Sequence, residues 1–210
     1  MGRLLLGKEY FPSDELYSVS KINYISNFER IKRLKPGDLL LVKTPGVIYR
    51  LGRKITKNIY DHIAVVLYNN ETLNIVVPET VIRPTSLFSK SNRIPLILRP
   101  KWVNVEQKKK FIYEMEKFRN SLYNSKKTII GVFINIIYSR LGIKIKIKKL
   151  DRTAKRWICT EAILLCLIEA FPEFSAINTL KLDYNEIGFA TTNDFLRIAE
   201  KFPELLEVIK

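Results

Sequence analysis

Short apolar segments bounded by turn residues fill the first half of the chain, and helical patterns fill the second half. Pro36-Gly37 begins a turn and a buried strand in "KPGDLLLVKT" (35–44), and "HIAVVLYNNETLNIVVPET" (62–80) predicts a hairpin that turns at residues 69–71. A further strand is predicted at "IPLILRP" (94–100). Strands gathered early and helices gathered late predict the α+β class.

Helix-start patterns mark the second half of the chain. Asn104 with Gln107 and Thr191 with Asp194 have the spacing of capping boxes. The segment 155–171, "KRWICTEAILLCLIEAF", predicts a buried helix that opens with Cys159. The alternating segment "IKIKIKK" (143–149) predicts a strand or an exposed arm. Apolar residues after Asn104 recur at helical spacing: Phe111, Ile112, Met115, Phe118 and Leu122.

Length and composition indicate one soluble domain. The 210 residues are 47% apolar, which is enough for a sizeable core. We expect residues 1–34 to form an extension packed on a domain of residues 35–210. The longest apolar run, 128–138, is too short to span a bilayer, and no secretory signal is visible, so a cytoplasmic protein is expected.

The chain has two cysteines and one histidine, which excludes a disulfide framework and a structural zinc site. Cys159 and Cys166 lie on one predicted helix, roughly 10 Å apart, too far for a disulfide. Cys166 lies mid-helix between leucines and has the character of a small buried hydrophobe. Cys159 lies in the first turn, where free N–H groups and the helix dipole favour a thiolate.

His62 opens an apolar strand, and Glu79 interrupts the strand that pairs with it. A two-residue turn at 69–70 or at 70–71 would place Glu79 opposite or diagonal to His62, at Cβ separations of about 5–8 Å. A three-residue turn would place Glu79 on the other face of the hairpin. Packing alone is an alternative explanation for His62, and a solvent-facing charge is an alternative for Glu79.

The order of these motifs resembles the YiiX-like families of permuted papain-fold hydrolases, which belong to the NlpC-type superfamily and are related to lecithin retinol acyltransferase. The resemblance spans roughly residues 35–200. One departure is Asp61, where the family commonly has Ser or Gly before the histidine. The matching positions are Gly37-Asp38, His62, Glu79, Trp157-Ile158-Cys159-Thr160-Glu161 and Thr191-Thr192-Asn193-Asp194-Phe195.

The resemblance implies an antiparallel sheet or small barrel packed on helices, and a cysteine hydrolase of peptidase or amidase type that needs no cofactor or metal. Cys159 would attack a carbonyl, His62 would act as the base, and Glu79 would orient the imidazole. An acyl-thioester would form on Cys159 and would be resolved by water or another acceptor. The substrate would be a peptide, an amide or an acyl ester.

The net charge of +15 indicates attraction to an acidic surface or polymer. A basic tract beside the predicted Cys159 helix is the candidate contact for an anionic substrate or membrane surface, and a solvated loop is the alternative. No pattern for reading specific bases is present. The tract comprises Lys144, Lys146, Lys148, Lys149, Arg152, Lys155 and Arg156.

Two other functions fit the same sequence. An inert protein with this fold would hold an anionic partner such as nucleic acid, a membrane surface or a capsid, and its binding would be salt-sensitive. A lipid acyltransferase or thioesterase would have a hydrophobic channel leading to Cys159.

Overall fold

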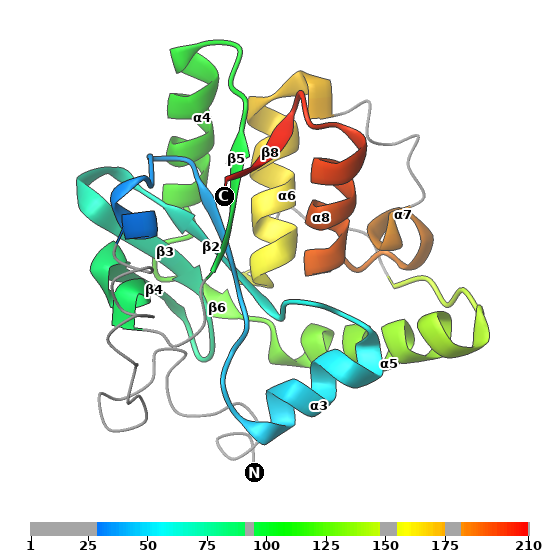
Figure 1. Cartoon of the computed structure of the whole chain (residues 1–210). Helices are drawn as coiled ribbons and strands as arrows, with labels where there is room; N and C mark the ends of the chain where they lie inside the picture. Colours follow the sequence, from blue (N-terminus) through cyan, green and yellow to red (C-terminus); the bar gives the residue numbers. More distant parts are fainter. Residues whose placement is uncertain (1–28, 91–94, 148–154, 175–181, 210) are drawn as a thin grey trace.

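The computed structural model describes residues 29–90, 95–147, 155–174 and 182–209. Within these residues the chain forms an α+β fold in which an antiparallel sheet of six strands packs against helices (Figure 1). The strand order is β4-β3-β2-β1-β5-β8. The strands are β1 (Leu39–Val42), β2 (His62–Val66), β3 (Glu71–Ile75), β4 (Thr80–Pro84), β5 (Leu96–Pro100) and β8 (Leu206–Ile209). The short strands β6 (Leu122–Tyr123) and β7 (Arg156–Trp157) form a separate parallel pair.

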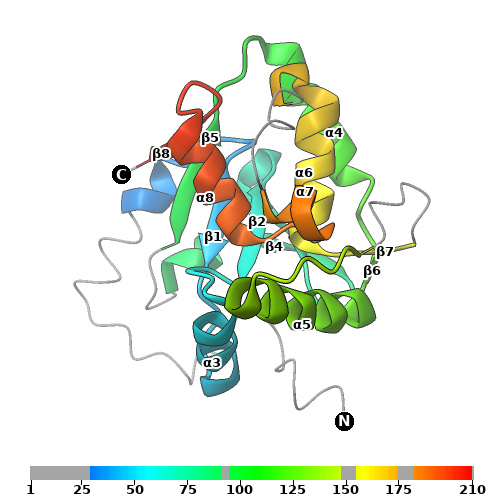
Figure 2. The same ribbon diagram turned by 90° about the vertical axis from the view of Figure 1, so that its right-hand side faces the viewer.

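The helices form two groups around the sheet. Helices α4, α6 and α8 lie along one side of it, and α3 and α5 lie next to each other at one end of the molecule (Figures 1 and 2). The α-helices are α3 (Val47–Thr56), α4 (Val105–Glu116), α5 (Ser125–Leu141), α6 (Cys159–Ala170), α7 (Asp183–Ile187) and α8 (Thr192–Lys201). Two 3-10 segments are η2 (Tyr68–Asn70) and η3 (Thr85–Lys90).

The central strand β2 is apolar on both of its sides because both faces of the sheet are covered. Ile63 and Val65 belong to the main core, which also holds most of α6. Ala64 and Val66 belong to a smaller core on the opposite face. Strand side chains alternate between faces, so His62 starts on the side of Ala64 and Val66.

Residues that precede β1 cover part of the smaller core. Ile31 and Leu34 pack against the smaller core, while residues 1–28 of the predicted extension lie outside the described residues. The carboxylate of Asp38 is buried and accepts from Nε and Nη2 of Arg99 at 2.8 and 2.7 Å. A two-pronged pair of this kind fixes the start of β1 against β5.

The predicted helix starts are confirmed. Helix α6 begins at Cys159, and α8 begins after a capping box formed by Thr191 and Asp194. At α4, Oδ1 of Asn104 accepts from the backbone N–H of Gln107 at 2.9 Å. The Gln107 side chain accepts from the N–H of Val103 instead of completing the box. Helix α4 ends at Glu116, before the last two positions of the predicted apolar pattern.

Other parts of the prediction need correction. Of the two alternatives for the segment 143–149, the exposed arm is the one present: residues 143–146 are exposed and irregular, Ile147 packs against the main core, and residues 148–149 lie outside the described residues. Helices α3 and α5 and strand β8 were not predicted. None of the described helices has both the length and the apolar character needed to cross a bilayer.

Candidate active site

Cys159 is the first residue of α6, and its thiol meets backbone N–H groups from two directions. Backbone groups of Thr160 and Cys159 at the start of α6, and of Ile63 in β2, lie close enough to the thiol to lower its pKa. Because Ile63 follows His62 directly, the fold brings the sulfur to the first peptide of β2. The side chain is nearly closed off from solvent, with 4% of Cys159 exposed.

Burial decides the protonation state of this thiol. It raises the pKa of Cys159 to about 11, and the backbone hydrogen bonds oppose that rise without cancelling it. The charge of Asp61 raises the pKa further. The prediction of a lowered thiol pKa at this helix start is therefore wrong for the closed site, since loss of hydration outweighs the helix N-terminus.

His62 is also buried, with 6% exposed. Burial lowers its pKa to about 4, and a hydrogen bond with the Asn74 side chain acts in the opposite direction. The imidazole is consequently neutral at pH 7 and is able to accept a proton.

Asn74 lies on β3, next to the strand that carries His62. Strands β2 and β3 pair Val66 with Thr72 and Val65 with Leu73. Continuing this register places Asn74 on the same side of the sheet as His62 and diagonal to it. The amide nitrogen donates to the carbonyl and Oγ1 of Thr72, both at 3.2 Å. These bonds turn Oδ1 away from Thr72, and it lies within reach of the imidazole, although not at the distance and angle of a well-formed bond.

The sequence analysis missed Asn74. It could have been found as the polar residue in the otherwise apolar stretch "TLNIVV". A polar side chain that faces the interior of a strand needs a hydrogen-bond partner. The structure gives Asn74 a fully buried position.

Glu79 occupies a different position from the one that the hairpin argument requires. Tyr68–Asn70 forms a three-residue turn, with Asn69 and Asn70 at positive φ of 61° and 58°. Neither two-residue turn is present, so the predicted registers are wrong. Glu79 is exposed and forms an isolated bridge with Leu122. No described hydrogen bond or ion pair joins its side chain to Cys159.

Asp61, the residue before His62, forms an ion pair with Arg53. Its carboxylate accepts a hydrogen bond from a guanidinium nitrogen of Arg53 in α3. The backbone N–H of Thr44 donates to both carboxylate oxygens of Asp61, at 3.0 and 3.1 Å. Burial nonetheless raises its pKa, against the effect of these bonds. Arg53 thereby anchors α3 to the residue that precedes His62.

Tyr123 is a second side chain near the thiol that the sequence analysis did not identify. Burial raises its pKa, and a charge on Cys159 would raise it further. Its hydroxyl accepts from Oγ1 of Thr128 at 3.0 Å. Its backbone N–H donates to Pro78 at 2.9 Å, which joins β6 to the segment before β4.

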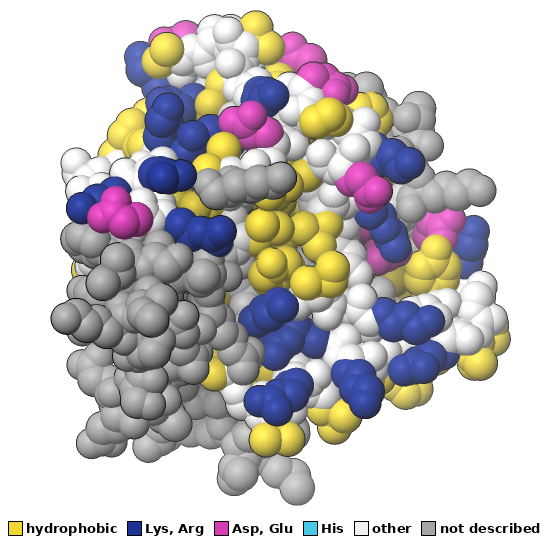
Figure 3. Space-filling view, in the orientation of Figure 1, with side chains coloured by type: hydrophobic (Ala, Val, Ile, Leu, Met, Phe, Trp, Pro, Cys, Tyr) yellow, Lys and Arg dark blue, Asp and Glu magenta, His cyan; other side chains and the backbone are white. Residues whose placement is uncertain are grey.

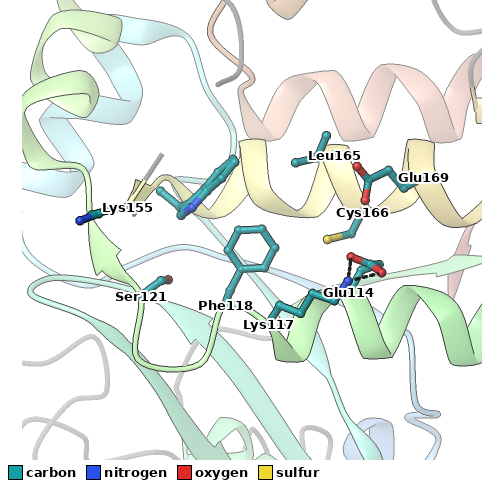
Figure 4. A pocket seen from close by; sticks show the side chains of 9 residues that line it. Glu114, Lys117, Phe118, Ser121, Lys155, Leu165, Cys166 and Glu169 are labelled. Atoms are coloured by element: carbon teal, nitrogen blue, oxygen red, sulfur yellow. Dashed lines mark hydrogen bonds and ion pairs between the residues drawn. The ribbon is translucent and has the colours of Figure 1, made fainter. Parts of the chain in front are cut away.

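A pocket of about 340 Å³ lies between α4 and α6, but it opens at Cys166 rather than at Cys159 (Figure 4). The Cys166 thiol points toward Glu114 and Lys117, which pair with each other at 2.6 Å. Burial raises the pKa of Cys166. Cys166 has 1% exposure and packs in the main core, as predicted for a small hydrophobe.

The structure describes four members of the basic tract. Lys155 and Arg156 are exposed just before α6, and Lys146 is exposed beyond α5. Lys144 pairs with Glu186 of α7 at 3.0 Å. The other three, Lys148, Lys149 and Arg152, lie outside the described residues. Among the described residues, no three His, Cys, Asp or Glu side chains cluster so as to hold a metal ion.

No family model matches the chain, and no curated protein matches it. Among solved structures the chain is similar to the metalloprotein YiiX from Escherichia coli O157:H7, with 13% identity, a TM-score of 0.42, and coverage of 84% of this chain and 96% of that one.

Proposed function

We propose that the chain is a cysteine hydrolase with a permuted papain-like arrangement, in which Cys159 is the nucleophile and His62 the base. The observation that carries the proposal is the approach of the Cys159 thiol to the backbone of Ile63, the residue that follows the buried His62. This arrangement of Cys159 and His62 does not depend on Glu79.

We assign the orienting role to Asn74 in place of Glu79. Its carboxamide is buried, is fixed by Thr72, and lies beside the imidazole on the neighbouring strand. An amide oxygen that accepts from one ring nitrogen directs the other nitrogen toward the thiol and steadies the imidazolium that forms.

The reaction would begin with attack of the Cys159 sulfur on a carbonyl carbon of an amide or ester. His62 takes the thiol proton and delivers it to the leaving amine or alcohol, and an acyl-thioester remains on Cys159. Water then attacks the thioester carbonyl, and His62 takes a proton from the water. The carbon–sulfur bond breaks, His62 returns the proton to the Cys159 sulfur, and the acid product departs. The N–H groups at the start of α6 are suited to stabilise the oxyanion at each addition step.

The two pKa values define when the proton moves. Because the pKa of the Cys159 thiol is about 11 and the pKa of the His62 imidazole is about 4, the proton stays on sulfur at pH 7 while both side chains are buried. Proton transfer therefore has to accompany substrate entry and attack, rather than precede them as in a preformed thiolate–imidazolium pair.

The test uses p-nitrophenyl acetate as a simple acyl donor. We expect an acetyl group on Cys159, detected by mass spectrometry of its peptide, and steady release of p-nitrophenol. Cys159→Ala and His62→Ala should abolish both signals, whereas Cys166→Ser, the matched cysteine control, should retain them. Equal acetylation of both cysteines, or unchanged acetylation in His62→Ala, would refute the proposal.

The orienting residue is tested separately. Asn74→Ala should lower the p-nitrophenol rate about tenfold or more and change its pH profile, because the ring loses its fixed tautomer. Asn74→Gln should not restore the rate, since the longer side chain displaces the amide. A larger loss in Glu79→Ala than in Asn74→Ala would return the role to Glu79.

A further inference from the structure

Helix α5 exposes an apolar side to solvent. Ile129, Ile130, Phe133 and Leu141 are all exposed, Phe133 by 62%. Their spacing places them on one side of the helix. The other side is buried and includes Gly131 and two further residues, Ile134 and Asn135. A helix that is apolar all round is normally covered all round, so a large apolar side without cover indicates an interaction surface.

Helix α3 extends this surface. Val47, with 77% exposed, and Leu51 project from the side of α3 that also carries the exposed Arg50 and Lys54. The spacing of these four positions is that of a single helix face. Helices α3 and α5 contact each other and lie next to each other in two views (Figures 1 and 2). We call the exposed side of both helices the α3–α5 face.

The charges of the α3–α5 face have one sign. Neither α3 nor α5 contains Asp or Glu. The apolar stretch of α5 runs between the exposed Lys126 and Arg140. Lysine and arginine side chains gather over these two helices, with hydrophobic side chains between and below them (Figure 3). The face therefore combines bulky hydrocarbon with uncompensated positive charge.

We propose that the α3–α5 face binds the surface of a lipid bilayer that contains anionic phospholipids. Ile130 and Phe133 would enter the boundary between headgroups and acyl chains, while Lys126 and the other bases would meet phosphate and carboxylate groups. In this contact, α3 and α5 would lie along the bilayer surface, at the level of the lipid headgroups.

The composition of the face favours a bilayer over other occupants. Nucleic acid would satisfy the bases but would leave Phe133 and Ile130 in water. A second copy of the chain would cover the apolar groups but would bring two acid-free basic faces together. An anionic bilayer satisfies both kinds of side chain at once. This inference does not depend on the proposed hydrolase activity.

The test is flotation of the full chain with phosphatidylcholine vesicles, with and without phosphatidylserine. We expect binding to the anionic vesicles, and at least about tenfold weaker binding to the neutral ones and in high salt, because several bases contribute about fivefold each. Phe133→Asp and Ile130→Asp should each weaken binding about tenfold or more, since a buried apolar side chain is lost.

Matched controls lie on α4, away from this face. Val105→Asp replaces an equally exposed apolar residue. Lys126→Glu should weaken binding to the anionic vesicles, and Lys110→Glu is its control. Both controls should bind as the unchanged chain does. Circular dichroism and thermal melting confirm folding of each variant.

Three results would overturn the proposal: no flotation with anionic vesicles, equal loss in the α4 controls, or binding that Phe133→Asp leaves intact. A dimer that Phe133→Asp dissociates, or a preference for duplex DNA over anionic vesicles, would assign the face to another occupant. Acetylation of Cys159 in the absence of lipid reports on the proposed hydrolase separately.

Discussion

The ammonium group of Lys127 lies 2.7 Å from Oε1 of Glu161, and this pair joins α5 to the first turn of α6. Glu161 is almost fully buried, and burial raises its pKa while Lys127 lowers it. Glu161 follows Cys159 by two residues, so the pair fixes the helix start that presents the thiol.

Removing Lys127 should destabilise the fold. In Lys127→Met the Glu161 carboxylate stays buried without its cation, and we expect a loss of about 3 kcal/mol in the free energy of unfolding. Urea denaturation measures this loss. Adding Glu161→Gln should recover part of it. The exposed pair of Lys109 and Glu106, at 3.0 Å, gives the control: Lys109→Met should cost less than about 1 kcal/mol. Equal losses would contradict a buried pair.

The stability of the protein should depend on pH through its single histidine. Burial lowers the pKa of His62 from its ordinary 6.5 to about 4. The unfolded chain therefore binds a proton first as pH falls, and stability present above pH 6.5 is lost progressively as pH falls to about 4. The loss is about 3 kcal/mol. Comparison with His62→Gln isolates this contribution from the carboxylates, and parallel pH curves for the two proteins would show a solvated imidazole.

Two glycines on neighbouring helices should respond in opposite directions to alanine. A Cβ at Gly131 in α5 would clash with the ring of Phe189, so Gly131→Ala has to separate α5 from the core at a cost of about 1–3 kcal/mol. At Gly52 in α3 a Cβ meets nothing within 4 Å. Gly52→Ala should stabilise by up to about 1 kcal/mol through helix propensity. Thermal unfolding of both variants compares them, and destabilisation by both would place a contact at Gly52.

Alkylation of Cys159 should continue to accelerate well above neutral pH. Burial raises the pKa of the thiol to about 11, so the thiolate fraction grows about tenfold per pH unit through the neutral range. Iodoacetamide labelling, quantified on the Cys159 peptide, measures this rate. The urea-unfolded chain, with a thiol near its ordinary value, is the reference. A plateau near pH 7 in the folded protein would instead mean a preformed thiolate.

Local patterns predicted the parts of the fold that depend on neighbouring residues. The capping residues Asn104 and Thr191 and the start of α6 at Cys159 follow from short-range hydrogen bonding and helical periodicity. The class of the fold followed in the same way. Strand β8 was missed because its pairing with β5 joins residues far apart in the chain, and no local pattern reports such a pairing.

The candidate site was predictable only in part. Cys159 and His62 stand out by residue type, but the third residue of the proposed site depends on a turn whose length the sequence leaves open. One additional turn residue replaced Glu79 by Asn74 as the neighbour of His62, because strand side chains alternate between faces. The thiol pKa was mispredicted because burial of Cys159 depends on the whole core rather than on its place in α6.

Two ion pairs join the helices of the α3–α5 face to the interior of the protein. Arg53 of α3 pairs with Asp61, and Lys127 of α5 pairs with Glu161. Each helix is tethered by one buried pair to the backbone beside the imidazole or beside the thiol. A ligand that shifts either helix must break the ion pair of that helix or move the neighbouring backbone with it. The two ion pairs thus connect α3 and α5 to residues next to His62 and Cys159.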